Sequence, residues 1–163
     1  MGALPEDGRL LELGCGWSTV WFANHLGPNQ ELVSVEHDKG WWEKMIPHVV
    51  HDERIDLRFR PPECDPGPYG THLRENPTGV SSFIFGYPYE QCDVVFIDGL
   101  ARGACFSAAL LECEPGTTIF HHDAQRHLWY GWAWQLAENA NCKIQMHPPR
   151  DGHPSEMLEC RIP

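Results

Sequence analysis

The chain has 163 residues, of which 42% are hydrophobic, and its formal net charge at pH 7 is −11. This length suits one domain with a sizeable core, and the hydrophobic fraction excludes a disordered chain. Because only 12 residues are Lys or Arg, and these are scattered, we expect no nucleic-acid partner and instead a small neutral or cationic substrate.

The sequence carries no membrane or secretion signal. No apolar stretch approaches the roughly 20 residues of a membrane-spanning helix, so we expect no membrane span. The N-terminus lacks the basic and apolar regions of a secretory leader, which predicts a cytoplasmic protein. The first predicted strand is reached by residue 9, an abrupt start that suggests the loss of a preceding segment. The seven cysteines contain no Cys-x-x-Cys pair, which favours reduced, buried thiols over zinc binding or a disulfide framework.

In the first half of the chain, strand and helix signals alternate. Apolar residues predict a buried strand over 10–13, and a helix over 18–26 ends at Gly27-Pro28. A second strand is predicted over 31–36, a second helix over 41–50, and a half-exposed edge strand over 55–59. Residues 61–92 are rich in proline and glycine, which predicts a long loop with one short helix.

The second half continues the alternation. Residues 93–98 (DVVFID) form the strongest strand signal, followed by a helix over 102–113, a strand over 117–122 and a helix around 128–136. Two strands, 142–146 and 158–162, close the chain without a helix between them, so they are able to pair antiparallel. Alternating strands and helices imply parallel pairing with right-handed crossovers. We therefore predict one α/β domain over 1–163: a doubly wound, mostly parallel, seven-stranded Rossmann-like sheet with an antiparallel final strand.

The joint between the first strand and the first helix is glycine-rich. In sheets of this kind, ligands bind beyond the carboxyl ends of the strands. Gly14 permits a tight turn there, and Gly16 lets a ligand approach the backbone next to the free N–H groups of the following helix. Glu36 ends the second strand and is able to accept hydrogen bonds from both hydroxyls of a ribose. The alternative is that the two glycines serve turn geometry alone.

The pattern differs from the dinucleotide fingerprint, because Thr19 stands at the position of its third glycine. The motif ELGCG (12–16), with VSVEHD (33–38) after it, instead resembles the class I S-adenosylmethionine-dependent methyltransferases. The resemblance implies that S-adenosylmethionine is the cofactor, that the glycine loop holds its methionine part, that Glu12 orients the ammonium group and that Glu36 holds the ribose. The cofactor-binding residues that it implies are Glu12, Gly14, Cys15, Gly16, Trp17, Ser18, Glu36, His37 and Asp98.

Two subfamilies share further residues with this sequence. VFIDG (95–99) and PGTTIFHHD (115–123) are similar to catechol-type O-methyltransferases, which implies that Asp98 and Asp123 bind a divalent metal such as Mg²⁺, Mn²⁺ or Co²⁺; Ala124 stands where that family has Asn. The stretch 117–136 and the ending LECRIP also resemble plant glucuronoxylan O-methyltransferases, which carry a His-Asp pair after the corresponding strand. Leu100 replaces the proline that follows Asp-Gly in that family.

Asp98, His122 and Asp123 end the fourth and fifth predicted strands, so we expect them to form the catalytic site. Strands in a sheet lie roughly 4.8 Å apart, which lets the two acids share one cation or one hydroxyl. Side chains alternate along a strand, so only one of His121 and His122 is able to face the site, and we favour His122. A metal held by the two acids is favoured over a metal-free site that titrates through His122. The competing interpretation is that both acids cap the helices that follow them.

The sequence thus predicts an S-adenosylmethionine-dependent O-methyltransferase acting on a small molecule or saccharide. A nicotinamide-dependent oxidoreductase, an aminopropyltransferase of the spermidine synthase type and a non-catalytic nucleoside-binding remnant are the alternatives. A homodimer is left open, and the identity of the acceptor is not indicated.

Overall fold

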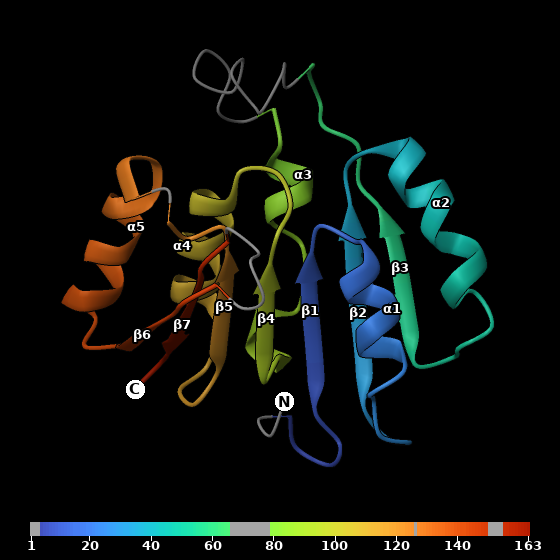
Figure 1. Ribbon diagram of the computed structural model, residues 1–163, viewed down its shortest axis with the longest axis horizontal. Coiled ribbons are helices and arrows are strands. Elements are labelled where there is room, and N and C mark those ends of the chain that lie inside the picture. The colour runs from blue at the N-terminus through green and yellow to red at the C-terminus, as the bar shows by residue number, and fades with distance from the viewer. Residues whose placement is uncertain (1–3, 66–78, 126, 150–154) are drawn as a thin grey trace.

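The computed structural model describes residues 4–65, 79–125, 127–149 and 155–163, and its centre is a seven-stranded sheet (Figure 1). The strand order is β3-β2-β1-β4-β5-β7-β6. The strands are β1 (Arg9–Leu13), β2 (Glu31–Glu36), β3 (Ile55–Phe59), β4 (Val94–Ile97), β5 (Thr118–His122), β6 (Lys143–His147) and β7 (Met157–Arg161). The helices are α1 (Trp17–Ala23), α2 (Lys39–Val49), α3 (Ser81–Ile84), α4 (Arg102–Glu112) and α5 (His127–Asn139), with a 3-10 turn at Tyr89–Gln91.

The pairing confirms the predicted topology. The pairs β2–β3, β1–β2, β1–β4 and β4–β5 are parallel. Strand β7 pairs antiparallel with both β5 and β6. Strand β3 lies at one edge of the sheet, as its alternating pattern predicted. The closing pair is more than a terminal hairpin, because β7 enters the sheet between β5 and β6. Residues 66–78 of the predicted long loop lie outside the described residues.

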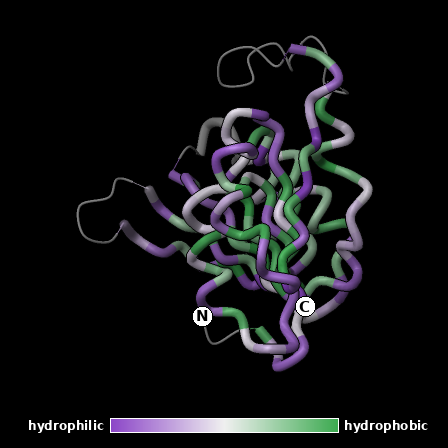
Figure 2. The backbone as a smooth tube through the Cα atoms, turned by 90° about the vertical axis from the view of Figure 1, so that its right-hand side faces the viewer, coloured by the Kyte–Doolittle hydropathy of each residue, from purple (hydrophilic) through white to green (hydrophobic). Residues whose placement is uncertain are grey.

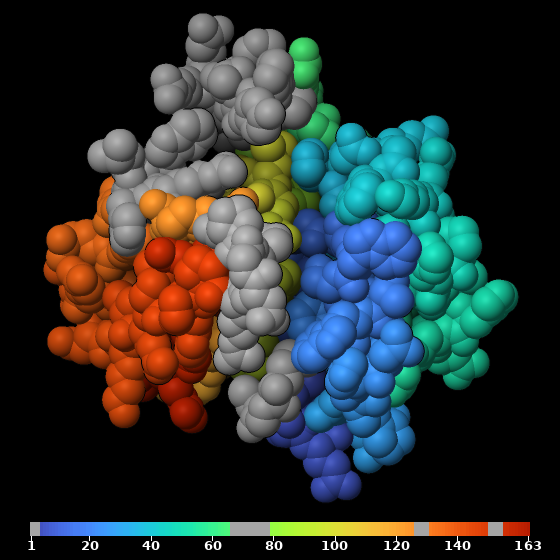
Figure 3. All heavy atoms as spheres, in the orientation of Figure 1, coloured from blue at the N-terminus to red at the C-terminus, as the bar shows by residue number. Residues whose placement is uncertain are grey.

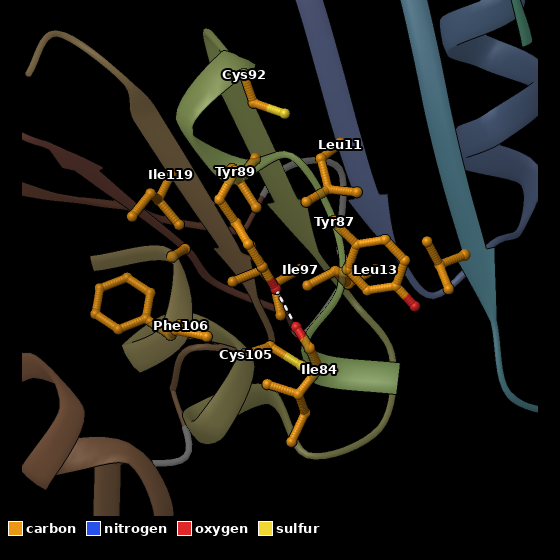
Figure 4. Packing of buried hydrophobic residues seen from close by; sticks show 14 of the residues in the cluster. Leu11, Leu13, Ile84, Tyr87, Tyr89, Cys92, Ile97, Cys105, Phe106 and Ile119 are labelled. Atoms are coloured by element: carbon orange, nitrogen blue, oxygen red, sulfur yellow. Dashed lines mark hydrogen bonds between the residues drawn. The ribbon is translucent and has the colours of Figure 1, made fainter. Parts of the chain in front are cut away.

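Two apolar layers cover the two faces of the sheet, because side chains alternate along each strand. Leu10 packs with Phe22 of α1 and with Leu32 on one face. Leu11 and its neighbours pack on the opposite face against α3, α4 and α5. In Figure 2 the hydrophobic segments of the tube gather at the centre of the molecule. The larger layer surrounds Tyr89, whose hydroxyl donates to the backbone oxygen of Ile84 at 2.6 Å (Figure 4).

Helix α1 ends earlier than predicted, at Ala23 rather than near Gly27. Arg54 accounts for the difference, since its guanidinium donates to the backbone oxygens of Ala23 at 3.1 Å and Leu26 at 2.6 Å. The N–H of Gly27, which would continue the helix, donates instead to the side chain of Gln30. Arg54, which is distant in sequence, thus supplies donors to the carbonyl groups at the end of the helix, and Gln30 supplies the acceptor for the N–H of Gly27.

Two further predictions concern membrane-spanning helices and the state of the cysteines. Among the described helices, none has the length and apolar character that crossing a bilayer requires. All seven cysteines fall within the described residues and are free thiols, of which Cys15, Cys92, Cys105 and Cys160 are buried. Burial raises the pKa of each of these four thiols, which keeps them protonated.

Candidate functional site

The glycine loop 14–16 and the loop after β4 touch each other through their backbones. Gly14 has a φ of 103°, and a Cβ placed on it would lie 2.4 Å from the Cα and N of Gly99. A Cβ on Gly99 would in turn lie 2.9 Å from the Cα of Gly14. Only glycine at both positions allows this approach. The cofactor loop predicted from the sequence is therefore held directly against the residue that follows Asp98.

Glu12 lies beneath this loop and is completely buried. One of its carboxylate oxygens accepts from the Ser18 hydroxyl at 2.5 Å, and the other accepts from Thr19 at 2.6 Å and Ser34 at 2.5 Å. Burial raises the pKa of Glu12 to about 7, although the three hydroxyls oppose this effect. Glu12 thus ties the start of α1 to β1 and β2. Its predicted contact with an ammonium group stays a prediction.

Glu36 ends β2 beside the same loop, and only 3% of its surface is exposed. Its carboxylate accepts backbone N–H groups from Cys15 at 2.9 Å, His37 at 2.9 Å and Asp38 at 2.7 Å. The Nδ1 atom of His37 lies 2.7 Å from the same carboxylate. The structure therefore brings together the loop and the predicted ribose acid. One carboxylate oxygen accepts from the Cys15 N–H, and the other accepts from the N–H groups of His37 and Asp38.

Two tryptophans flank the glycine loop. The Trp41 indole N–H donates to the backbone oxygen of Cys15 at 2.6 Å, and the Lys44 ammonium lies 4.2 Å from its ring centroid. Trp17, at the start of α1, is 57% exposed, and its ring centroid is 5.1 Å from that of His48. A Cβ on Gly16 would lie 3.5 Å from the indole nitrogen of Trp41, which is an ordinary van der Waals contact. Two aromatic rings thus lie beside the glycine loop.

Asp98 and His122 meet where β4 and β5 end. Asp98 follows β4, His122 is the last residue of β5, and the His122 Nδ1 lies 2.9 Å from an Asp98 oxygen. The hydrogen bond to Asp98 raises the pKa of His122, although burial opposes the shift. The N-cap position of helix α4 is occupied by Ala101 rather than Asp98, and it makes no side-chain cap hydrogen bond. The two residues form a polar pair on the same edge of the sheet as the glycine loop.

His121 points to the other face of the sheet, as the alternation predicted. Its side chain is fully buried and its ring stacks on Phe106, with 5.6 Å between centroids. Burial lowers the pKa of His121 to about 4, so this ring stays neutral. Of the two adjacent histidines, only His122 joins the cluster at the strand ends.

Asp123 completes the predicted cluster, and Arg102 joins it as a residue that sequence reasoning missed. Arg102 Nη1 donates to Asp123 at 2.7 Å, and its Nη2 lies 3.3 Å from Asp98. The hydroxyl of Ser155 donates to the other Asp123 oxygen. Burial by itself would raise the pKa of Asp123, but the bonds from Ser155 and Arg102 outweigh it and hold the pKa well below its ordinary value. The sequence carried no specific signal for this role, since Asp98 lies before the first residue of α4 and the two residues do not share a helix face.

The three residues at the strand ends offer the donor types of a divalent-metal site. One ligand atom from each of Asp98, His122 and Asp123 lies within 4.8 Å of the others, which is a suitable donor set by type. The Arg102 guanidinium already bridges the two carboxylates, however, and the Nδ1 of His122 is directed at Asp98 rather than at a shared centre. These residues therefore do not fit a divalent ion as they are arranged.

The comparisons with known proteins agree with this architecture. The chain matches the model of a methyltransferase domain family over residues 11–124, which include the glycine loop, Glu36 and the strand-end acids. No curated protein matches it in sequence.

Solved structures share the fold at low identity. An O-methyltransferase from Bacillus cereus, in complex with SAH, is 18% identical with a TM-score of 0.63; the match covers 96% of this chain and 74% of that one. Fibrillarin from Aeropyrum pernix, with bound S-adenosyl-L-methionine, is 13% identical with a TM-score of 0.65, covering 97% and 68%. The CurJ carbon methyltransferase is 17% identical with a TM-score of 0.62, covering 99% of this chain but 50% of that one. Together with the family match, the strand order and the glycine loop, these likenesses show that the chain belongs to the methyltransferase domain family and is a class I S-adenosylmethionine-dependent methyltransferase.

Proposed function

We propose that the chain transfers the methyl group of S-adenosylmethionine to a hydroxyl oxygen of a small molecule or saccharide. The observation that carries this proposal is the His122–Asp98 pair at the strand ends, on the same edge of the sheet as the glycine loop. A hydroxyl is a poor nucleophile until its proton is removed or shared, so a positioned base is most useful for an oxygen acceptor. The shared fold does not choose the acceptor atom, since a carbon methyltransferase has it too.

The residues around the glycine loop fit the nucleoside and methionine parts of the donor. Glu36 supplies a buried carboxylate beside the loop, and Trp17 and Trp41 supply aromatic rings next to it. We expect Glu36 to exchange its bond with the Cys15 N–H for ribose hydroxyls, and Trp17 or Trp41 to cover the base. The donor supplies an activated methyl group on a sulfonium centre, so the protein needs mainly to align and deprotonate the acceptor.

His122 is the proposed proton acceptor and Asp98 its positioning partner. A proton on Nδ1 that is directed at the Asp98 carboxylate leaves the lone pair of the neutral ring on Nε2. The acceptor oxygen forms its bond to the methyl carbon while the carbon–sulfur bond breaks and its electron pair stays on sulfur. The acceptor's proton passes to Nε2, and Asp98 stabilises the imidazolium that results.

The proposal is tested with methyl-labelled S-adenosylmethionine, using catechol and a glucuronate-bearing xylan oligosaccharide as the acceptor probes. Asp98→Ala and His122→Ala should each leave S-adenosylhomocysteine affinity largely intact and slow transfer by about 10²-fold or more. His147→Ala is the matched control, because His147 also pairs with a carboxylate, Glu159 at 2.7 Å, and should transfer normally. Full activity in an Asp98→Ala, Asp123→Ala double variant would show that both acids are structural.

A further inference from the structure

Arg102 contacts residues at the carboxyl ends of both β4 and β5. It is the first residue of α4, and its side chain is 16% exposed. Its Nε donates to the backbone oxygen of Gly99 at 3.0 Å, and its Nη1 donates to the backbone oxygen of His122 at 3.2 Å. The same guanidinium contacts Asp98 and Asp123. It therefore holds the loops after β4 and β5 in one arrangement.

We propose that Arg102 takes the place of a divalent cation in this site and supplies a single positive charge between the two acids, so that the chain binds no catalytic metal. Two carboxylates this close repel each other unless a positive charge lies between them. The planar fork of a guanidinium matches two carboxylates geometrically and does not lose its proton. The site thus has an internal cation that is covalently part of the fold.

Three of the four carboxylate oxygens of Asp98 and Asp123 contact neighbouring donors. Asp98 Oδ1 faces His122 and Arg102, Asp123 Oδ2 accepts from Arg102, and Asp123 Oδ1 accepts from Ser155. Mg²⁺ and Mn²⁺ need several oxygen ligands at short distances and in a regular geometry. Such an ion would have to displace a donor from Asp123 and to lie beside the positive charge of Arg102.

Ala124, the residue after Asp123, also argues against a bound metal. Ala124 is buried and its N–H donates to the backbone oxygen of Glu156 at 3.0 Å, so it offers no side-chain ligand. The catechol-type resemblance implied Asn there. Ala124 therefore adds no oxygen ligand to the two acids that Arg102 already contacts.

For catalysis, which rests on the proposed function, Arg102 is a positioning residue. It keeps the Asp98 carboxylate where His122 Nδ1 meets it, and its bond to the His122 backbone fixes the end of β5. We therefore expect transfer to continue in the presence of a chelator.

The test is Mn²⁺ binding, measured by electron paramagnetic resonance and by titration calorimetry on the full chain. Wild type should bind no stoichiometric Mn²⁺ in the cluster. Arg102→Ala should gain one bound Mn²⁺, because it leaves the two acids without their cation, and Arg102→Ala, Asp123→Asn should lose it again. Arg58→Ala is the matched control, since it removes the same charge from an ion pair with Asp56 on β3 and should gain no site.

Arg102→Gln provides a second test if the alanine variant fails to fold, because it keeps the polar chain without the charge and should also gain Mn²⁺. Stoichiometric Mn²⁺ binding by wild type that disappears in Asp98→Asn would overturn the proposal, and so would folded Arg102 variants that bind none. These readouts do not depend on methyl transfer. Failure of the proposed function would appear separately, as absent transfer in a wild-type protein that behaves as expected toward Mn²⁺.

Discussion

The contact between Gly14 and Gly99 allows a stability prediction that separates two physical effects. A Cβ on Gly14 would lie 2.4 Å from backbone atoms of Gly99, and the φ of 103° disfavours any L side chain. An unfavourable backbone conformation costs roughly 1–2 kcal/mol, and forcing extra atoms into packed structure costs typically about 1–3 kcal/mol. Gly14→Ala should therefore lower the free energy of unfolding by about 2–5 kcal/mol.

Substitutions at three other glycines measure separately the two costs that Gly14→Ala combines. Gly116 has a φ of 96° and nothing within 4 Å of a Cβ, so Gly116→Ala measures the backbone cost alone, about 1–2 kcal/mol. Gly99→Ala measures close contact alone, because its Cβ would meet Phe83 at 2.8 Å and Gly14 at 2.9 Å. Gly16→Ala should change stability by less than about 1 kcal/mol, since its extended backbone suits any residue and its nearest neighbour is 3.5 Å away.

The assay is urea unfolding followed by circular dichroism, with the slope checked for each variant. If Gly14→Ala costs no more than Gly116→Ala, the two loops are not held against each other and the argument from close approach is wrong.

Three further predictions concern binding and pH. Glu36→Ala should weaken S-adenosylhomocysteine binding by about 1.5–3 kcal/mol in calorimetry, because ribose hydroxyls lose a charged acceptor, while NAD should bind neither form; unchanged affinity would place the nucleoside elsewhere. Because the Asp98 bond raises the pKa of His122, kcat should rise with pH through that raised pKa as the base loses its proton, and Asp98→Asn should move the midpoint to lower pH. A rate independent of pH would remove His122 as the base. The net charge of −11 predicts no nucleic-acid binding near physiological salt, and a salt-sensitive shift of RNA in a gel would contradict it.

Most of the fold could be predicted because its signals are local. The strand over 31–36 is observed with the same bounds, and the run 93–98 contains β4. The insertion of β7 between β5 and β6 was not predicted. The local sequence pattern of a strand does not show which unpaired strand edge it joins. The early end of α1 was also missed, since it depends on Arg54, a residue 31 positions from Ala23.

The candidate site was predicted in its residue types but not in its arrangement. Asp98, His122 and Asp123 were expected together because the carboxyl ends of parallel strands meet at one edge. Arg102 was missed because a single arginine at a helix start has many uses, and only the tertiary structure shows that it reaches both acids. The contact of Gly99 with the backbone of Gly14 was not predicted either, because it joins two loops that lie 85 residues apart in the sequence.

The backbone contact of Gly14 with Gly99 also bears on how the enzyme keeps its reactants aligned. One glycine belongs to the loop that we expect to hold the donor, and the other follows Asp98, the partner of the proposed base. Figure 3 shows the first part of the chain, in blue and cyan, on one side of the molecule and the last part, in orange and red, on the other. Side chains change rotamer within nanoseconds, but two peptide backbones in contact have no rotamers to change. The spacing between donor and base is therefore set by main-chain atoms, and a misplacement of about 1 Å in such an alignment is enough to slow a reaction 10²-fold. Substitutions outside these two loops can then alter which acceptor is bound, while the spacing between donor and base stays constant.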